Sequence, residues 1–304
     1  MNEERQIPLG KTEVLVSALG VGTNSWGSRT GPDHDKHATF AALMDAGITF
    51  FDTAEIYQAT ASERTIGECM RAAKRTPTVL TKFFPFPWRL GKGRMTPALR
   101  RSLKRLQVPS VDVYILHFPL PPVSLEAWAD ALADQVKAGL ARAVGISNCD
   151  EHQMRRAHAV LNARGVPLAC NEVELSLLRP AAALGGLLGA CRELGVTLIS
   201  YRPLAQGMLT GKYSVDHPPR GPRAAIYGRD TLAKMQPLVE SLRRIGAERG
   251  RTPAQAALNW VICKGALPIP GAKDPAQARE NAGAMGWRLS PEEIGELESA
   301  SRAL

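Results

Sequence analysis

The chain has 304 residues, 44% of them hydrophobic, and a formal net charge of +9. Its longest nearly apolar run, residues 181–191, is far shorter than the ~20 residues that span a bilayer, and the charged N-terminus precedes no apolar signal core. These features exclude a membrane-spanning protein and predict a cytoplasmic one. Five scattered cysteines without a C-x-x-C pair argue against a disulfide framework or a zinc site, so we expect no metal.

The positive charge raises the question of a nucleic-acid partner. The two basic clusters, residues 100–105 and Arg243-Arg244, lie in segments of helical periodicity, and no nucleic-acid-binding motif accompanies them. A solvated helix face explains them more simply, so we predict neither nucleic acid nor a membrane as a partner. The charge instead favours a phosphate-bearing cofactor or an acidic substrate. The oligomeric state stays unknown.

Strand-like apolar runs alternate with helix-periodic segments along almost the whole chain. We predict eight strands, at residues 18–21, 49–52, 79–82, 111–117, 141–146, 168–172, 197–201 and 266–269. The predicted helices include residues 35–46, 97–106, 125–138, 151–164, 184–194 and 232–249, and several end at a glycine suited to a C-cap. Eight uninterrupted β/α units predict one α/β domain over residues 1–304, a closed (β/α)8 TIM barrel of parallel strands.

Three stretches do not fit the repeat. Residues 5–17 resemble a β-hairpin with its turn at Gly10-Lys11, which we expect to cap the bottom of the barrel. Residues 83–95 form a long aromatic and basic loop after the third strand, and residues 206–229 form a longer loop after the seventh. Long loops that follow strands lie on the C-terminal face of such a barrel, where they shape the substrate mouth.

Three consecutive strands end in an ionisable residue. Asp52, Lys82 and His117 follow the apolar runs of the second, third and fourth strands, and Tyr57 comes five residues after Asp52. An unpaired buried ammonium is costly, so Lys82 needs a partner, and Asp52 on the neighbouring strand is the obvious one. The alternative for the whole set is a structural ion pair with two packing side chains.

With these residues in register, the chain resembles the aldo-keto reductases over nearly its full length, from residues 9–12 to residues 286–290. The resemblance implies an NADP-dependent oxidoreductase that interconverts a carbonyl (aldehyde or ketone) and an alcohol by hydride transfer, with Asp52, Tyr57, Lys82 and His117 as its catalytic tetrad. It also implies a site for NADPH/NADP+ in which Ser147 and Asn148 hold the nicotinamide carboxamide, residues 201–213 span the pyrophosphate and residues 270–281 bind the adenosine. The cofactor-binding residues assigned in this way are Gly22, Thr23, Asn24, Ser147, Asn148, Glu172, Tyr201, Arg202, Pro203, Leu204, Gln206, Gly207, Gly271, Lys273, Gln277, Glu280 and Asn281.

The chemistry of these groups suits such a reaction. A carbonyl that accepts hydride develops negative charge on its oxygen and needs a proton. We expect the Lys82 ammonium to lower the pKa of the Tyr57 phenol, which makes Tyr57 the general acid/base, and we expect His117 to orient the carbonyl. Lys273 favours the 2′-phosphate of NADP over NAD, and a purely solvent-facing lysine is the alternative.

Glu172 and Leu175 depart from the family pattern Asn-Gln-x-x-Tyr-Ser, whose Gln binds the carboxamide and whose Tyr stacks on the nicotinamide ring. Here the segment reads Asn171-Glu172-Val173-Glu174-Leu175-Ser176. An ionised Glu172 beside the ring attracts the cationic oxidised nicotinamide, so we hypothesise that NADP+ binds tightly relative to NADPH. A protonated Glu172, or one turned away from the ring, is the open alternative.

The substrate is a small-molecule carbonyl or alcohol that the sequence specifies poorly. We expect Trp26, Phe84, Trp88 and Phe118 to line an apolar and aromatic pocket. Two rival functions stay open, because fold alone does not choose among them. One is a family member that retains its cofactor and catalyses epimerisation or elimination through transient oxidation. The other is a nucleotide-binding regulatory subunit, like the potassium-channel β subunits.

Overall fold

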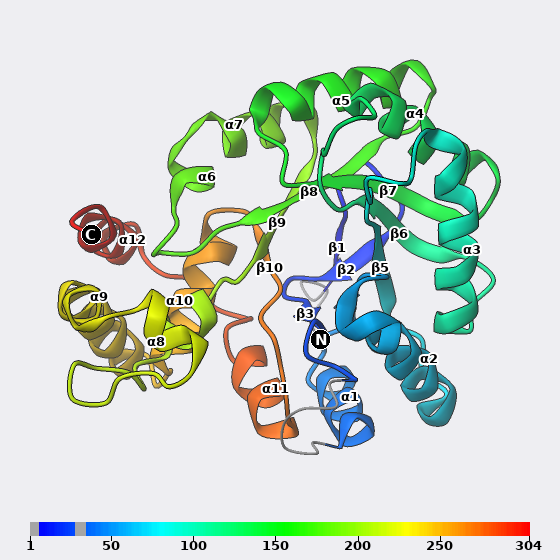
Figure 1. The fold of residues 1–304 in the computed structure, drawn as a ribbon. Coiled ribbons are helices and arrows are strands. Elements are labelled where there is room, and N and C mark those ends of the chain that lie inside the picture. Colours follow the sequence, from blue (N-terminus) through cyan, green and yellow to red (C-terminus); the bar gives the residue numbers. More distant parts are fainter. Residues whose placement is uncertain (1–5, 28–34) are drawn as a thin grey trace.

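The structure is a computed structural model that describes residues 6–27 and 35–304. Eight parallel strands stand side by side in chain order, with helices around them (Figure 1). The strands are β3 (Val21–Gly22), β4 (Phe50–Asp52), β5 (Thr78–Phe83), β6 (Val111–Leu116), β7 (Ala141–Ser147), β8 (Leu168–Glu174), β9 (Thr197–Tyr201) and β10 (Leu267–Pro268). A parallel bridge between Gly22 and Gly271 joins the two ends of this sheet. The predicted (β/α)8 barrel is confirmed.

Helices connect the strands and form the outer layer (Figure 1). They are α1 (Lys36–Asp45), α2 (Ala61–Ala73), α3 (Met95–Leu106), α4 (Leu125–Lys137), α5 (Glu151–Ala163), α6 (Ala181–Leu184), α7 (Gly186–Leu194), α8 (Pro222–Ile226), α9 (Arg229–Glu248), α10 (Pro253–Cys263), α11 (Pro275–Ala282) and α12 (Pro291–Arg302), with the 3-10 helices η2 (Tyr57–Thr60), η3 (Lys92–Arg94) and η4 (Ala205–Thr210). Side-chain caps fix several starts; Asp150 and Thr252, for example, form capping boxes. Within residues 6–27 and 35–304, no helix is long and apolar enough to cross a membrane, and no cluster of His, Cys, Asp or Glu is suited to a metal ion.

The predicted N-terminal hairpin is present and packs against the bottom of the barrel. Its strands β1 (Gln6–Pro8) and β2 (Leu15–Ser17) pair antiparallel. Between them, Gly10 has a φ of +58° and donates its N–H to Thr197 Oγ1 at 2.7 Å. A Cβ on this residue would lie 2.5 Å from the carbonyl oxygen of Ala169, so only glycine fits the turn.

Apolar side chains form two separate cores. One fills the barrel interior and combines Leu9, Val14 and Val16 of the hairpin segment with strand residues such as Val113. The larger core lies between strands and helices and includes Tyr114, the next residue of β6. Because successive side chains of a strand point to opposite faces, each of the strands β4 to β9 supplies both cores. The hairpin thereby closes the interior core from below.

All eight predicted strands are present, and most of their bounds shift by one or two residues. The first and last strands are shorter than predicted. The first is predicted at residues 18–21 but observed at Val21–Gly22, because β2 extends to Ser17 and the chain must then turn into the barrel. The last is predicted at residues 266–269, but only Leu267–Pro268 pair, because the prolines at 268 and 270 lack an N–H. The two long loops contain short helices: η3 in the first, and η4 and α8 in the second.

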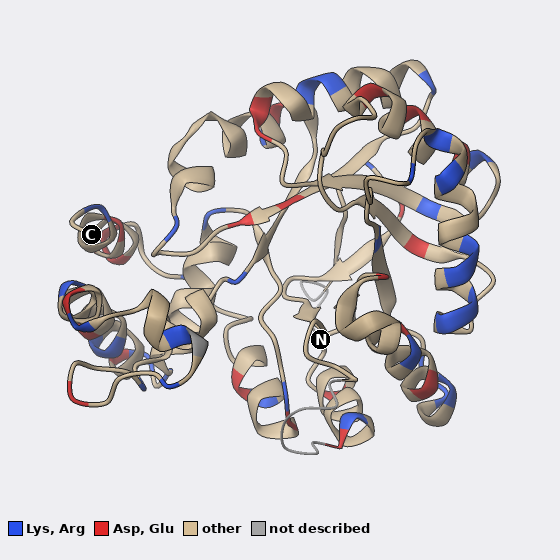
Figure 2. Cartoon of the chain, in the orientation of Figure 1, with Lys and Arg blue, Asp and Glu red and all other residues tan. Residues whose placement is uncertain are grey.

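The basic clusters lie on outer helices. Residues 100–105 belong to α3 and Arg243-Arg244 to α9, and Figure 2 shows Lys and Arg along both. Some of these residues pair with carboxylates: Arg244 contacts Glu248 at 2.7 Å and Glu296 at 2.5 Å. The clusters are thus part of a mixed-charge helix surface.

Candidate active site

Lys82 is the centre of a buried ion-pair cluster near the carboxyl ends of the strands. Asp52 ends β4 and Lys82 lies near the end of the adjacent β5. Lys82 is fully buried, and its ammonium donates hydrogen bonds to Asp52 Oδ1 and, at 3.1 Å, to the carbonyl oxygen of Thr53. Burial acts to lower the pKa of Lys82, but the charges of Asp52 and Glu172 raise it overall. Lys82 is therefore an ammonium at neutral pH in the free protein, with the partner that the sequence predicts.

A second carboxylate, that of Glu172, shares the same ammonium. Glu172 lies on β8, is 2% exposed, and has its Oε2 3.3 Å from Lys82 Nζ. Burial raises the pKa of Glu172 to about 8; the charge of Asp52 adds to this rise and Lys82 opposes it. Nothing in the sequence indicates this contact, because two strands separate β8 from β5 in the sheet and the side chains meet across the barrel interior.

Tyr57 begins the short helix η2, beside Lys82. Lys82 Nζ lies 5.1 Å from the centroid of the Tyr57 ring, and the His117 ring meets that ring edge to face at 5.8 Å. The three residues that follow all have positive φ, namely Gln58 at 50°, Ala59 at 49° and Thr60 at 77°. Such a run is costly for residues other than glycine and is typical of functional sites. The sequence does not indicate this strained turn.

The net pKa shift of Tyr57 differs from the prediction. Burial raises the pKa of Tyr57 above its usual range. Lys82 lowers it, as expected, but Asp52 and Glu172 raise it again, so the overall direction is upward. The predicted overall lowering is wrong, because burial and a second carboxylate outweigh the ammonium. Tyr57 is therefore protonated at neutral pH, which is the state that a proton donor requires.

His117 directly follows β6 and completes the predicted group of four. Its ring contacts Phe84 edge to face at 5.7 Å and stacks on Phe118 at 5.0 Å. Burial lowers the pKa of His117 to about 3, and the Lys82 charge acts in the same direction, so the imidazole is neutral at physiological pH. Its buried Nδ1 has no hydrogen-bond partner among the described residues. A buried polar atom without a partner needs an explanation, and a hydrogen bond to a ligand is one that suits His117.

Ser147 and Asn148 lie where β7 ends and are joined to the cluster by hydrogen bonds. Asn148 Nδ2 donates to the carbonyl oxygen of His117 at 3.0 Å and to Ser147 Oγ at 2.9 Å, and Asn148 Oδ1 accepts from the Tyr201 hydroxyl at 2.9 Å. Ser147 Oγ in turn donates to the carbonyl oxygen of Glu172 at 2.8 Å. The structure thus brings three predicted cofactor residues and the tetrad to the same end of the barrel.

The loop after β9 has an unusual backbone. In its first six residues, φ is positive at Arg202 (51°), Ala205 (47°), Gln206 (58°) and Gly207 (94°). Pro203 is buried, Leu204 is half-buried, and the exposed Arg202 lies 3.7 Å from Glu174. Left-handed residues other than glycine are uncommon and concentrate at ligand sites. That this turn spans a pyrophosphate stays a prediction.

The segment after β10 presents Lys273 to solvent. Gly271 is exposed at the barrel closure, and Lys273 is exposed with no carboxylate of the described residues paired to it. Gln277 Oε1 accepts the Lys273 N–H at 3.1 Å, and Asn281 Nδ2 donates to the carbonyl oxygen of Gly271 at 3.2 Å. Glu280 is exposed on the same helix, α11. Gln277 and Asn281 therefore stabilise the turn that carries Lys273 by hydrogen bonds to its backbone.

Gly22, Thr23 and Asn24 lie at the end of β3, next to β4. Thr23 is fully buried, and its hydroxyl donates to the carbonyl oxygen of Asp52 at 2.7 Å. Asn24 is exposed, and its carbonyl oxygen accepts from Gln58 Nε2 at 2.8 Å. Thr23 thus supports the end of β4, whereas Asn24 and the half-buried Gly22 are open to a ligand.

Trp26 lies in the wall of the barrel and not, as predicted from the sequence, in the substrate mouth. Its side chain is fully buried, meets Phe51 edge to face at 5.9 Å, and donates from Nε1 to the carbonyl oxygen of Ala272 at 2.9 Å. With its N–H paired and its ring covered, Trp26 packs in the wall of the barrel. Leu175 is also fully buried.

The other three predicted pocket residues belong to a line of rings that starts at His117. Phe84 contacts Phe118 at 6.0 Å and Phe86 at 4.6 Å, and Phe86 stacks on Trp88 at 4.6 Å. Phe84 and Phe118 are half-buried, whereas Trp88 is 71% exposed. Phe84 and Phe118 therefore border the tetrad, and Trp88 lies at the outer end of the line.

Glu55, which the sequence does not single out, anchors the loop that carries these rings. It is 6% exposed; its Oε1 accepts the Phe84 N–H at 2.8 Å, and its Oε2 accepts from Arg89 Nη2 at 2.9 Å. Arg89 also donates to the carbonyl oxygen of Phe84 at 2.9 Å. The one feature of the sequence that points to a role for Glu55 is its acidic side chain in a largely apolar segment between Asp52 and Tyr57.

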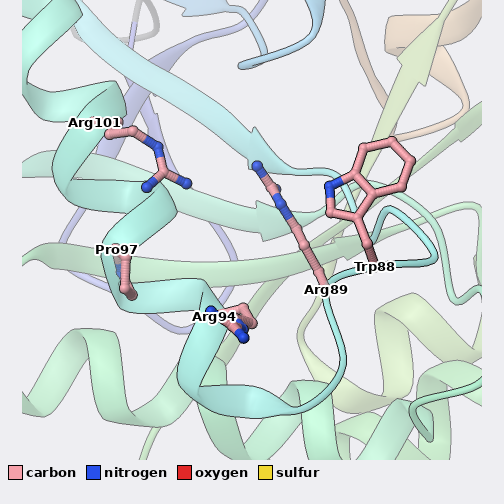
Figure 3. Close-up of a pocket in the computed structure, with 5 residues that line it drawn as sticks. All are labelled: Trp88, Arg89, Arg94, Pro97 and Arg101. Carbon is pink, nitrogen blue, oxygen red and sulfur yellow. The ribbon is translucent and has the colours of Figure 1, made fainter.

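A separate cationic cavity of about 390 Å³ lies beside this loop. Its lining residues are Trp88, Arg89, Arg94, Pro97 and Arg101 (Figure 3). Arg89 is held by Glu55, while Arg94 and Arg101 pair with no carboxylate in the part of the chain that the structure describes. No tetrad residue lines this cavity, so these charges lie apart from the reacting groups.

Comparison with known proteins agrees with the fold. The sequence profile of the Aldo/keto reductase family matches residues 18–302. The chloroplastic pyridoxal reductase of Arabidopsis thaliana is 38% identical, over 94% of this chain and 84% of its own length. The NADP(+) aldo-keto reductase yakc of Schizosaccharomyces pombe is 31% identical, over 94% of this chain and 88% of its own. A crystal structure of an aldo/keto reductase from Klebsiella pneumoniae with NADP and acetate superposes with a TM-score of 0.77 at 28% identity, covering 97% of this chain and 95% of that one. The chain belongs to the aldo-keto reductase family.

Proposed function

We propose that this protein is an NADP-dependent oxidoreductase that interconverts an aldehyde or ketone and an alcohol, with Tyr57 as the general acid/base. The observation that carries the proposal is the cluster of Asp52, Lys82, Tyr57 and His117, which come from four different elements. Residues at the carboxyl ends of barrel strands form the active face of this fold. Family membership supports an oxidoreductase, and relatives named for or solved with NADP support the cofactor.

Each residue has a role that its surroundings support. When bound, the nicotinamide supplies or accepts the hydride. Tyr57 gives its proton to the carbonyl oxygen as that oxygen gains negative charge, Lys82 stabilises the phenolate that remains, and Asp52 holds the ammonium in place. His117, which is neutral, orients the carbonyl by a hydrogen bond without adding a charge that would repel Lys82.

The same end of the barrel offers groups that fit a phosphorylated dinucleotide. Lys273 and Arg279 are exposed cations at α11, and neither pairs with a carboxylate among the described residues. Unpaired cations of this kind suit the 2′-phosphate of NADP. Arg202 and the left-handed turn at Gly207 offer a further cation and backbone N–H groups for the pyrophosphate.

The rings around His117 favour a carbonyl attached to a ring. Phe84 and Phe118 both contact the imidazole and are half-buried, so each can present an apolar face to a substrate. We therefore propose aromatic aldehydes as the substrate class. The match to a pyridoxal reductase makes pyridoxal the first aldehyde to test.

Nucleotide titration followed by turnover assays tests the proposal. We expect the protein to bind NADPH and NADP+ tightly and NADH and NAD+ weakly, by fluorescence, and to oxidise NADPH with pyridoxal or another aromatic aldehyde. Lys273→Ala should weaken NADPH binding about 10- to 100-fold and change NADH binding by less than about twofold, because one charge-assisted phosphate contact is lost. Lys137→Ala, which removes an exposed lysine at the opposite end of the barrel, is the matched control. A protein that binds none of the four nucleotides would overturn the proposal.

Glu172 favours one alternative within the same family. A buried carboxylate beside Lys82 attracts an oxidised, cationic nicotinamide and so favours a cofactor that stays bound, with net epimerisation or elimination. Nucleotide found on the purified protein, together with no turnover of free NADPH, would support this alternative over the carbonyl reductase.

A further inference from the structure

Glu172 carries a buried carboxyl group that the proposed mechanism does not use. We propose that Glu172 holds the proton that carbonyl reduction consumes: it is protonated while the site contains the reduced, neutral nicotinamide and ionised while the site contains the oxidised, cationic one. The inference rests on the proposed use of NADP. It makes Glu172 a positioning residue that acts through Lys82.

The contacts of Glu172 leave its carboxylate poorly compensated. Its Oε2 lies 3.3 Å from Lys82 Nζ and accepts no hydrogen bond within the described residues. The ammonium already donates to Asp52 and to the Thr53 carbonyl oxygen, and it has only three N–H groups. A buried carboxylate needs both a cation and hydrogen bonds to stay ionised. The protonated form of Glu172 is therefore favoured in the free protein, in line with its raised pKa of about 8.

Titratable and charged groups from several elements act on Glu172. They are Asp52 on β4, Tyr57 on η2, Lys82 on β5, Tyr201 on β9 and Cys170 on its own strand, while β7 contributes the uncharged Ser147. Burial raises the pKa of both tyrosines and of the cysteine, so all three are neutral at neutral pH. Burial raises the pKa of Asp52 as well, while the charge and hydrogen bond of Lys82 act to lower it. Asp52 accepts a hydrogen bond from Lys82, whereas Glu172 Oε2 accepts none among the described residues, so Asp52 is the carboxylate that stays ionised and cancels the ammonium. Glu172 is then the group whose protonation sets the charge of the cluster.

This charge balance links the protonation of Glu172 to the cofactor. A protonated Glu172 leaves the cluster neutral beside a neutral reduced ring, and an ionised Glu172 cancels the positive charge of an oxidised ring. Uncompensated charge is costly in a buried site of low dielectric. The reduced cofactor therefore favours the protonated carboxyl group, and the oxidised cofactor favours the ionised one. Glu172 and the nicotinamide therefore change charge together.

The proton transfers balance for reduction of a carbonyl. The incoming hydride forms the new C–H bond, and the Tyr57 proton forms the new O–H bond of the alcohol. An N–H proton of Lys82 then passes to the Tyr57 phenolate, and the O–H proton of Glu172 passes to the Lys82 amine. After these transfers Tyr57 and Lys82 have regained their protons, and the protein has lost only the O–H proton of Glu172. Solvent restores it after the alcohol and the oxidised nucleotide have left.

Proton-linked binding tests the inference without relying on turnover. The full-length protein is titrated calorimetrically with NADPH and with NADP+ in buffers of different ionisation enthalpy, which gives the protons exchanged on binding. The 2′-phosphate is common to both ligands, so its contribution cancels in the difference between them. At about pH 8 we expect NADPH binding to take up about half a proton or more relative to NADP+ binding. The ratio of Kd for NADPH to Kd for NADP+ should rise about tenfold between about pH 6.5 and about pH 9.

Three variants separate this role from a purely structural one. Glu172→Gln should abolish both the proton difference and the pH dependence of the ratio, and Glu172→Asp, which keeps a titratable carboxyl group, should restore a proton difference. Glu174→Gln, a half-buried position two residues further on the same strand, should behave like the wild type. Equal proton counts for both nucleotides in the wild type, or an unchanged difference in E172Q, would overturn the inference and leave the proposed function intact. Absence of binding to any nucleotide would instead overturn the proposed function, and this inference with it.

Discussion

The rings of Tyr57 and His117 meet edge to face with their centroids 5.8 Å apart, and the ammonium of Lys82 lies 5.1 Å from the centroid of the Tyr57 ring. Tyr57 thus lies between a cation, the Lys82 ammonium, and a neutral imidazole. This arrangement suits a phenol that gives up its proton only to an oxygen that is gaining negative charge. It also suits a separate neutral residue that holds that oxygen in place.

Replacing Tyr57 by phenylalanine removes the proton and keeps the ring. We expect Tyr57→Phe to lower kcat by about 10²- to 10⁴-fold, which is the usual contribution of a general acid. Because the ring still packs against His117, Kd for NADPH should change by less than about twofold. Steady-state kinetics and fluorescence titration measure the two quantities. Tyr227→Phe, at the half-buried residue after α8, is the control, and substantial turnover by Tyr57→Phe would remove Tyr57 from its assigned role.

His117 should not contribute a limb to the pH–rate profile near neutrality. Its pKa is lowered to about 3, so it loses its proton far below the usual value of 6.5 and stays neutral as the pH rises through that value. We expect kcat/KM for aldehyde reduction to be flat from about pH 5 to about pH 7. His117→Gln should lower the plateau without changing its shape. A limb near pH 6.5 that disappears in His117→Gln would show that His117 is cationic in the free enzyme.

The tetrad is predictable from the sequence for a definite physical reason. Strands that follow one another in a (β/α)8 barrel are neighbours, so ionisable residues at their ends converge whatever the intervening loops do. Asp52 and Lys82 lie near the carboxyl ends of adjacent parallel strands, so their side chains are neighbours. The same argument brings His117, after the next strand, to the same end of the barrel.

The remaining contacts depend on side-chain directions that periodicity does not fix. Glu172 reaches Lys82 from β8, which two strands separate from β5, and alternation along β8 indicates a face but not a partner across the barrel interior. Trp26 stands just after a strand, where a ring can line a mouth or pack in the wall, and only the donor contact to the Ala272 carbonyl oxygen decides between them. The net pKa shift of Tyr57 depends mainly on burial, whose extent the sequence does not give.

Glu172 should also make the stability of the protein depend on pH. Its pKa is about 8 in the folded protein against an ordinary value of 4.5, so between these values the folded state binds one proton more than the unfolded state. The free energy of unfolding therefore falls as the pH rises through this window, by at most about 1.4 kcal/mol per pH unit. Glu172→Gln lacks this loss, so its stability relative to the wild type should grow from about pH 5 to about pH 8 in urea unfolding. If the free energies of unfolding of the two proteins changed with pH in parallel, Glu172 would already be ionised in the folded protein. The control is Glu174→Gln, whose free energy of unfolding should follow that of the wild type at every pH.

The contact between Glu55 and Arg89 should stabilise the loop of residues 83–95. Glu55 is 6% exposed and accepts hydrogen bonds from both Arg89 and the Phe84 N–H, so Glu55→Gln leaves a largely buried guanidinium without its counter-charge. We expect a loss of about 1–3 kcal/mol in the free energy of unfolding, faster tryptic cleavage in the loop and a higher KM, because Phe84 borders the tetrad.

The matched control for Glu55→Gln is Asp45→Asn, which removes the carboxylate of the exposed ion pair between Asp45 and Arg75. An exposed pair contributes only about 0–1 kcal/mol, so this variant should unfold close to the wild type and keep its KM. If Glu55→Gln raised KM but left the cleavage rate of the loop unchanged, Glu55 would act on the substrate directly rather than through the loop. If both variants behaved alike, the buried position of Glu55 would carry no special weight, and the loop would be held by its ring contacts, Phe84 on Phe86 and Phe86 on Trp88.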